Sequence, residues 1–202
     1  MARDRTARPE AAPLRLFLSV EAPEEVLRDL DARVAPLRPL LPGARWTRPE
    51  GWHVTLKFLG ATWPRLLDEV RAAAKAAARA APPLESWLTE VGAFPSAGRA
   101  RVLWVGLSDP DGRLTGLASD LDERLRPWFT PERRAFTAHL TLARLDPPRD
   151  VRVEAPDLLA LRPDGRAFVI DRLVLYRSHL SPRGATYEAL GEFPLGTAAG
   201  EA

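Results

Sequence analysis

The chain has 202 residues, a formal net charge of +2 and no cysteine. That length suits one domain with a sizeable core, or two small lobes that share a sheet. The lack of cysteine excludes a disulfide framework and a cysteine-ligated zinc site. Because a dedicated binder of long duplexes would carry a larger basic surplus, any nucleic acid bound here is expected to be short or terminal.

The two ends of the chain are expected to lie outside the folded domain. Residues 1–13 mix charges and prolines without the apolar stretch of a secretion signal. Residues 196–202 are small or polar. We therefore predict one domain over residues 14–195 between two disordered tails. No apolar run approaches the roughly 18 to 20 residues that span a membrane, so we expect no membrane binding. We also expect a cytoplasmic monomer.

The first half of this domain alternates predicted strands and helices. Residues 14–20 are predicted to form a strand, and residues 23–37 a helix with two glutamates in its first turn, where carboxylates suit the helix dipole. An apolar, β-branched segment around His53 predicts the next strand. Apolar residues at helical spacing predict a helix over residues 65–80, and residues 84–91 return as a strand.

The second half follows a similar order. Residues 102–107 have the composition of a buried strand, residues 114–125 carry leucines on one helical stripe, and the segment around His139 predicts another strand. The remaining predicted elements are a weak helix over residues 151–161 interrupted by Pro156, and two closing strands over residues 168–176 and 186–193 joined by a Ser-Pro-Arg-Gly turn.

One short motif occurs in both halves. His53-Val-Thr55-Leu and His139-Leu-Thr141-Leu each place a histidine two residues before a threonine. Since successive side chains of a strand point to opposite faces, the histidine and threonine of each copy share one face. Two equivalent strands from two related lobes could then face each other across a single cleft.

Two imidazoles with two hydroxyls suit displacement at phosphorus. Imidazole has an unperturbed pKa near 6.5, so one ring can accept a proton from the attacking oxygen while the other supplies one to the leaving oxygen. Each threonine hydroxyl would hold a phosphoryl oxygen. A single His-x-Thr is usually an ordinary polar strand edge, but two copies in matching apolar contexts favour His53 and His139 as catalytic and Thr55 and Thr141 as substrate-binding.

The segments around these motifs resemble one enzyme family. Residues 46–60 contain Thr-Leu-Lys-Phe-Leu-Gly, residues 136–144 contain His-Leu-Thr-Leu-Ala-Arg, and residues 15–26 and 175–187 add flanking similarity. The chain resembles the two-histidine phosphoesterases, and within them the RNA 2′,3′-cyclic phosphodiesterases, long called 2′-5′ RNA ligases. The resemblance extends over about residues 15–195.

This resemblance implies a fold and a reaction. The fold is α+β, pseudo-symmetric and two-lobed, with two antiparallel sheets that form a central cleft and helices outside. The reaction is hydrolysis of RNA 2′,3′-cyclic phosphate ends to 2′-phosphomonoesters with no metal or other cofactor. With a 5′-hydroxyl in place of water, the same site would join RNA ends by a 2′-5′ bond. His53 would protonate the leaving O3′ and His139 would activate water, although the roles could be reversed.

Other activities share the same four motif residues. The superfamily also includes enzymes that act on small nucleotide cyclic phosphates and on 2′-5′ oligonucleotides, which differ only in the rest of the substrate. A non-catalytic module that binds RNA ends is a third possibility. The two intact His-x-Thr pairs argue against that loss of turnover.

Arg144 and Phe17 are further substrate-binding candidates. The resemblance implies an arginine at position 144 near the phosphate, yet a residue three positions after Thr141 points away in an ideal strand. The strand must therefore end or bulge by Ala143. Phe17 could fill the core or, as the resemblance favours, stack on a nucleobase at the cleft rim.

Three more residues have two interpretations each. Alternation continues the face of His53 and Thr55 to Lys57, which could hold a phosphate, although a lysine at a strand end is more often solvated. His179 has Ser181 rather than threonine two residues later. We interpret His179 as a surface or turn residue rather than a substrate contact, and Tyr187 in the same way.

Overall fold

The computed structural model describes residues 12–181 and 184–196. Its strands are β1 Leu14–Val20, β2 Arg45–Trp46, β3 Val54–Thr62, β4 Leu84–Ser86, β5 Leu88–Phe94, β6 Ala100–Leu107, β7 His139–Arg149, β8 Phe168–Ile170, β9 Arg172–Ser181 and β10 Gly184–Pro194. Its helices are α1 Glu24–Val34, α2 Leu67–Ala80, α3 Arg113–Leu125, α4 Val151–Glu154 and α5 Pro156–Ala160, with 3₁₀ turns η1 Ala35–Leu40, η2 Pro49–Gly51, η3 Pro64–Leu66 and η4 Ala97–Arg99. Most of both predicted tails lies outside the described residues, so the domain limits stay a prediction.

Two four-stranded sheets dominate the described part of the chain. The strand order is β10-β9-β1-β3 in one sheet and β2-β7-β6-β5 in the other, and β4 pairs with β8. Neighbouring strands in both sheets are antiparallel. One histidine motif starts at β3 and the other at β7, so each sheet contributes one copy. The predicted two-lobed α+β fold is confirmed.

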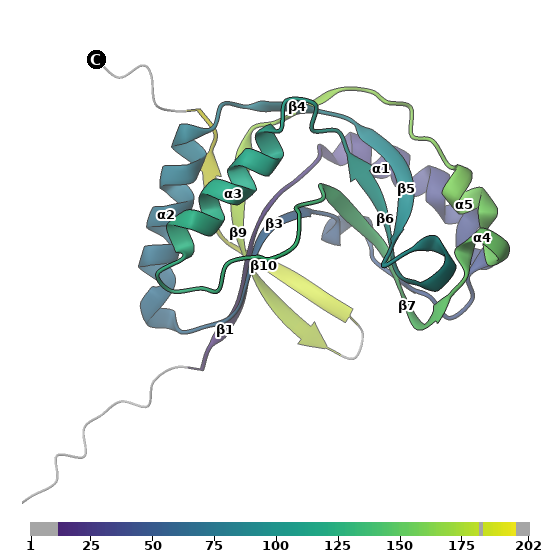
Figure 1. Ribbon diagram of the computed structural model, residues 1–202, viewed down its shortest axis with the longest axis horizontal. Helices are drawn as coiled ribbons and strands as arrows, with labels where there is room; N and C mark the ends of the chain where they lie inside the picture. The colour runs from purple at the N-terminus through teal and green to yellow at the C-terminus, as the bar shows by residue number, and fades with distance from the viewer. Residues whose placement is uncertain (1–11, 182–183, 197–202) are drawn as a thin grey trace, which may run out of the picture.

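Helices pack against both sheets (Figure 1). Helix α2 packs against β9 and β10, α3 packs against β3, and the two helices contact each other. The apolar stripes predict this arrangement, because α2 buries alanines and a valine while α3 buries four leucines. Helix α5 contacts β5 at the other sheet. Among the described residues, no helix has the length and apolar character to span a membrane.

Prolines account for most departures from the predicted boundaries. The helix expected to reach residue 37 ends at Val34 and continues as η1, which contains Pro36 and Pro39. The weak helix over residues 151–161 is two short helices that break at Ala155, the residue before Pro156. The strand expected over residues 84–91 is divided into β4 and β5, which belong to different sheets.

Candidate active site

A β-bulge in β7 brings Arg144 to the same side of the strand as Thr141. Two successive residues of β6 pair with Ala143 and Thr141, so Leu142 between them is the extra residue. Leu142 and Ala143 are both fully buried, whereas Arg144 is exposed. This doubled burial is what one inserted residue produces, because it reverses the alternation beyond it. The structural condition for Arg144 to face the cleft is therefore met.

Strand β3 has a bulge at the equivalent position. Two successive residues of β1 pair with Lys57 and Thr55, which leaves Leu56 as the extra residue. Leu56 and Lys57 are both buried, and Phe58 is 49% exposed. Each histidine motif is thus followed by the same irregularity. Phe58 occupies in the first motif the place that Arg144 occupies in the second.

The bulge removes Lys57 from the cleft face on which simple alternation places it. Its side chain is 5% exposed. Its ammonium group forms an ion pair with Asp122 of α3 and donates a hydrogen bond of 2.8 Å to the carbonyl oxygen of Thr130. Both interpretations of Lys57 were therefore wrong, since it neither faces a phosphate nor is solvated.

His139 presents one ring nitrogen to the cleft. Its Nδ1 lies 2.7 Å from the carbonyl oxygen of Thr137, which requires the proton on Nδ1 and leaves Nε2 for substrate. The rings of Phe94 and Trp104 stand edge-on at centroid distances of 5.1 and 6.2 Å. Burial lowers the pKa of His139, the bond to Thr137 opposes this shift, and the charge of Arg144 adds to it.

His53 has a matching environment in the other sheet. It also bonds the backbone two residues earlier, at Gly51. Burial lowers the pKa of His53 to about 4, the backbone bond opposes this shift, and the positive charges of His139 and Arg144 lower the pKa further. These charge interactions indicate that His53, His139 and Arg144 lie near one another, and the duplicated motif predicts this proximity for the two histidines.

The space between the sheets contains a cavity of about 800 Å³. Thr55, His139, Thr141 and Arg144 all line it, whereas His53 is not among its lining residues. A phosphoryl group beside these residues would meet hydroxyl groups from both sheets and the guanidinium of Arg144. Such a donor set suits an anion with exposed non-bridging oxygens.

A family model also identifies the chain. The description "LigT like Phosphoesterase" matches residues 20–104 and again residues 105–187, and each match contains one histidine motif. The chain belongs to the LigT-like phosphoesterase family. The two consecutive matches agree with the occurrence of the same motif and the same bulge in both halves.

Individual relatives cover nearly the whole chain. A protein of Thermus thermophilus is 31% identical over 195 residues, which is 90% of each chain, and one of Methanothermobacter thermautotrophicus is 30% identical over 186 residues, which is 90% of this chain and 99% of that relative. Both are named RNA 2′,3′-cyclic phosphodiesterase. A crystal structure of a Thermus thermophilus protein has a TM-score of 0.74 at 28% identity and covers 92% of this chain and 100% of its own.

The structure does not support base stacking by Phe17. Its side chain is only 3% exposed. The ring stacks on His53 at a centroid distance of 4.6 Å and lies 5.5 Å from Tyr176. A nucleobase has no access to a ring in that position. Phe17 instead packs against the His53 imidazole, so the interpretation as a core residue is the one that fits.

Tyr187 is a site residue that the sequence pattern missed. Its ring meets His53 edge-on at 4.9 Å. Gly51 leaves room for this contact, since a Cβ there would lie 3.2 Å from the tyrosine ring. Tyr187 reaches the site through the pairing of β10 with β9, which no local spacing indicates. His179 is different, because its Nε2 lies 2.8 Å from the Glu188 carboxylate and its side chain is well exposed.

Proposed function

We propose that this protein hydrolyses RNA 2′,3′-cyclic phosphate ends to 2′-phosphomonoesters. The observation that carries this proposal is the meeting of two His-Thr pairs, one from each sheet, beside Arg144. Opening a cyclic phosphate requires one proton to leave the attacking water and another to reach the departing O3′, and two imidazoles supply both transfers. The names of the relatives, at 30% and 31% identity over most of the chain, support this substrate.

In the proposed reaction, His139 accepts the proton of water and His53 donates a proton to O3′. Water forms the new P–O bond as the P–O3′ bond breaks, so the phosphate remains on O2′. Thr55, Thr141 and Arg144 bind the non-bridging oxygens, where negative charge grows. Burial lowers the pKa of His53 to about 4 and also lowers that of His139, so protonation without substrate does not by itself assign the acid to His53.

Leaving-group chemistry separates the two assignments. We expect His53→Ala to recover activity on a 2′,3′-cyclic phosphate with sulfur in place of O3′, because a thiolate leaves without protonation. His139→Ala should stay inactive on the same analogue. Single-turnover rates on the oxygen and sulfur substrates measure this difference, and recovery by His139→Ala instead would exchange the two roles.

The pH dependence should reflect the two depressed pKa values. The base must be neutral and the acid protonated, so kcat/KM should be bell-shaped. Because burial lowers both pKa values below the ordinary 6.5, the activity of the free enzyme should already decline as pH rises through that value. In kcat the bell should move to higher pH, since the bound phosphate anion stabilises the imidazolium. A kcat/KM profile that still rises above pH 7 would contradict this.

Turnover should not require a metal ion. Within residues 12–181 and 184–196, no three histidine, aspartate or glutamate side chains are grouped to hold a metal. The charge of the transition state is left to the threonine hydroxyls and Arg144. We expect exhaustive dialysis against EDTA to leave the rate on a 2′,3′-cyclic phosphate unchanged. Activity lost in EDTA and restored by Mg²⁺, Mn²⁺ or Zn²⁺ would overturn this mechanism.

A substrate panel tests the reaction class. The panel contains an oligoribonucleotide with a 2′,3′-cyclic phosphate end, a mononucleoside cyclic phosphate and a 2′-5′-linked dinucleotide, with products separated by chromatography. We expect the cyclic phosphates to be opened faster than the 2′-5′ linkage is cleaved. Binding of the oligonucleotide without any product would instead indicate a non-catalytic module.

We also propose that the enzyme works as a cytoplasmic monomer. One chain supplies both histidine motifs, so a single copy completes the site. A cysteine-free sequence suits a reducing compartment.

A further inference from the structure

The cavity extends well beyond the two histidine motifs. Its volume of about 800 Å³ lies toward the upper end of the roughly 300 to 1,000 Å³ that is typical of small-molecule sites. The additional wall includes the aromatic rings of Phe94 and Phe136 and the guanidinium groups of Arg101 and Arg134. None of these four residues belongs to a His-x-Thr motif.

The wall carries more positive charge than one cyclic phosphate requires. Arg101, Arg134 and Arg144 all line the cavity. In the part of the chain that the structure describes, the side chains of these three arginines form no ion pair or hydrogen bond with protein groups. A cyclic phosphodiester has a single negative charge, and Arg144 lies beside the threonines to meet it. Two arginines are left for another anionic group.

The acidic residues of the wall do not neutralise these two arginines. Asp122 is occupied by its ion pair with Lys57. The Glu132 carboxylate accepts hydrogen bonds of 2.9 and 3.2 Å from the backbone N–H groups of Arg133 and Arg134. Both carboxylates therefore organise the protein backbone, and the arginine side chains remain available to a ligand.

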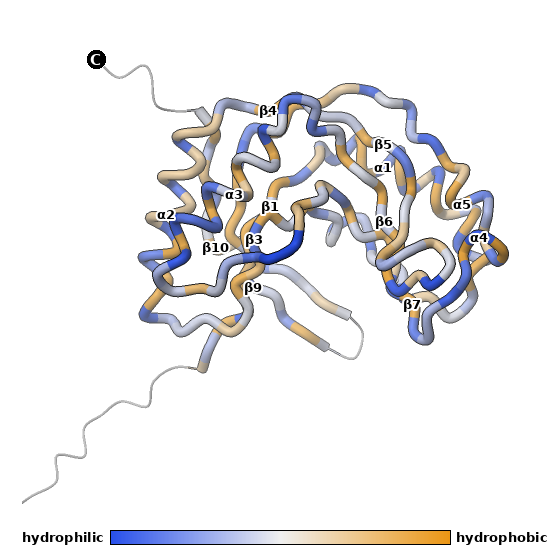
Figure 2. The backbone as a smooth tube through the Cα atoms, in the orientation of Figure 1, coloured by the Kyte–Doolittle hydropathy of each residue, from blue (hydrophilic) through white to orange (hydrophobic). Residues whose placement is uncertain are grey.

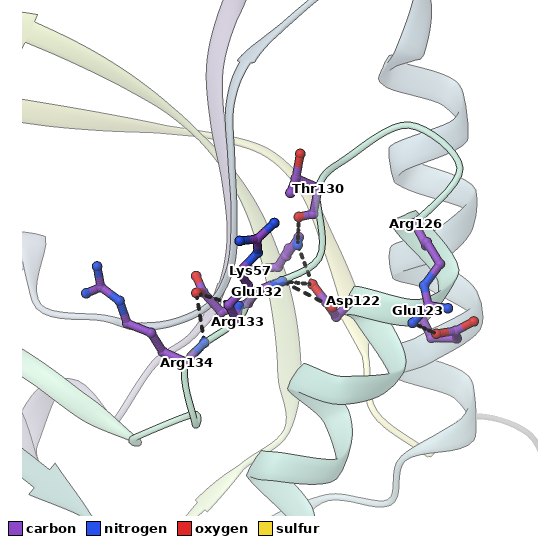
Figure 3. A network of polar contacts seen from close by, with 8 residues as sticks. All are labelled: Lys57, Asp122, Glu123, Arg126, Thr130, Glu132, Arg133 and Arg134. Atoms are coloured by element: carbon purple, nitrogen blue, oxygen red, sulfur yellow. Dashed lines mark hydrogen bonds and ion pairs between the residues drawn. The ribbon is translucent and has the colours of Figure 1, made fainter.

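The segment that carries Arg134 is fixed in place although it has no regular structure. Lys57 bonds Asp122 and the Thr130 carbonyl, and the Asp122 carboxylate accepts the Glu132 N–H at 3.1 Å (Figure 3). This network ties the strongly hydrophilic segment between α3 and β7 (Figure 2) to the strand of the first motif. A preorganised arginine loses less conformational freedom on binding than one on a loose loop. The buried Lys57 therefore helps to hold the segment that carries Arg134.

We propose that Arg134, assisted by Arg101, binds the phosphodiester immediately 5′ of the terminal nucleotide. This inference rests on the proposed function and deepens it. The two phenylalanines offer apolar surface to the terminal nucleoside, since base stacking on aromatic rings tolerates any sequence. The enzyme is then selective for the ends of RNA chains over mononucleoside cyclic phosphates, because a mononucleotide has no second phosphodiester.

Three substrates test this subsite. They are cytidine 2′,3′-cyclic phosphate, the dinucleotide CpC with a 2′,3′-cyclic phosphate end, and the same dinucleotide with an uncharged methylphosphonate linkage. We expect the wild type to favour the charged dinucleotide in kcat/KM by about 10- to 100-fold, the range of one charged hydrogen-bonding contact. The methylphosphonate should fall to near the level of the mononucleotide.

Matched variants assign the preference to a residue. Arg134→Gln should lose about tenfold or more on the charged dinucleotide and nothing on the mononucleotide, with Arg101→Gln smaller in the same direction. Arg133→Gln removes the same charge from the adjacent position, which does not line the cavity, and should keep the preference. The subsite is refuted if Arg134→Gln slows both substrates equally, if it keeps the preference, or if the wild type has none. Hydrolysis of neither substrate would refute the proposed function itself.

Discussion

Alanine at His53 or His139 should remove most of the turnover while RNA still binds. Each general acid or base typically contributes about 10²- to 10⁴-fold, and in the proposed reaction these two imidazoles carry out both proton transfers. In the proposed reaction the phosphate is bound by other groups, Thr55, Thr141 and Arg144, which both variants retain. Initial rates on an oligonucleotide with a cyclic phosphate end, combined with a binding titration, measure the two effects separately.

His179→Ala is the control for these variants. His179 is exposed, bonded to Glu188 and not among the residues that line the cavity, so its loss should cost little. Since His53 packs against Phe17 and Tyr187, urea unfolding of His53→Ala must show that a cooperative fold persists. Near-normal hydrolysis by His53→Ala would show that the proposed site is wrong.

Valine at Thr55 or Thr141 should lower kcat by roughly 10- to 1000-fold per lost donor. Both hydroxyls line the cavity from opposite sheets. A hydroxyl that bonds a phosphoryl oxygen contributes more as charge develops in the transition state, so kcat should fall more than KM rises. Serine at either position keeps the donor and should be much milder.

Thr115→Val provides a matched comparison in the same cavity. Thr115 lines the wall formed by α3, but its hydroxyl already donates a 2.7 Å hydrogen bond to Asp109. Its replacement should leave kcat unchanged. Unchanged kcat in both Thr55→Val and Thr141→Val would reduce the motif threonines to ordinary strand residues.

The cleft could be predicted from sequence because its key side chains follow the simplest rule of strand geometry. Alternation places His53 with Thr55 and His139 with Thr141, and the structure gathers both pairs in one site, with three of the four residues lining the cavity. The alternation of side chains breaks at Leu56, one residue after Thr55. Leu56 is an ordinary apolar residue, and nothing in its neighbourhood marks it as the bulge that turns Lys57 inward.

Long-range pairing was beyond the sequence pattern in a different way. From its position in the predicted strand, Phe17 could lie either in the core or at the cleft. Only the packing of β1 beside β3 decides between these two places. Tyr187 reaches His53 from β10, more than a hundred residues along the chain. Such contacts depend on how β10, β9 and β1 are assembled, which local periodicity does not encode.

The two halves share a backbone irregularity but differ in the side chain that follows it. Both motifs are followed by a bulge and then by an exposed residue, but that residue is Phe58 in one half and Arg144 in the other. Phe58 lines the cavity, and the Arg15 guanidinium lies 4.5 Å from its ring centroid. The two halves therefore offer different groups to the cavity at equivalent positions, an aromatic ring in one and a guanidinium in the other.

The position of the phosphate in the product tests the proposed reaction most directly. An oligoribonucleotide with a 2′,3′-cyclic phosphate end would be hydrolysed in ¹⁸O-water, and the product examined by mass spectrometry and ³¹P NMR. The proposed reaction predicts a 2′-phosphomonoester with one ¹⁸O atom, formed by the wild type and lost in both histidine variants. A 3′-phosphate, or a 2′-phosphate formed at the wild-type rate by His53→Ala or His139→Ala, would contradict it.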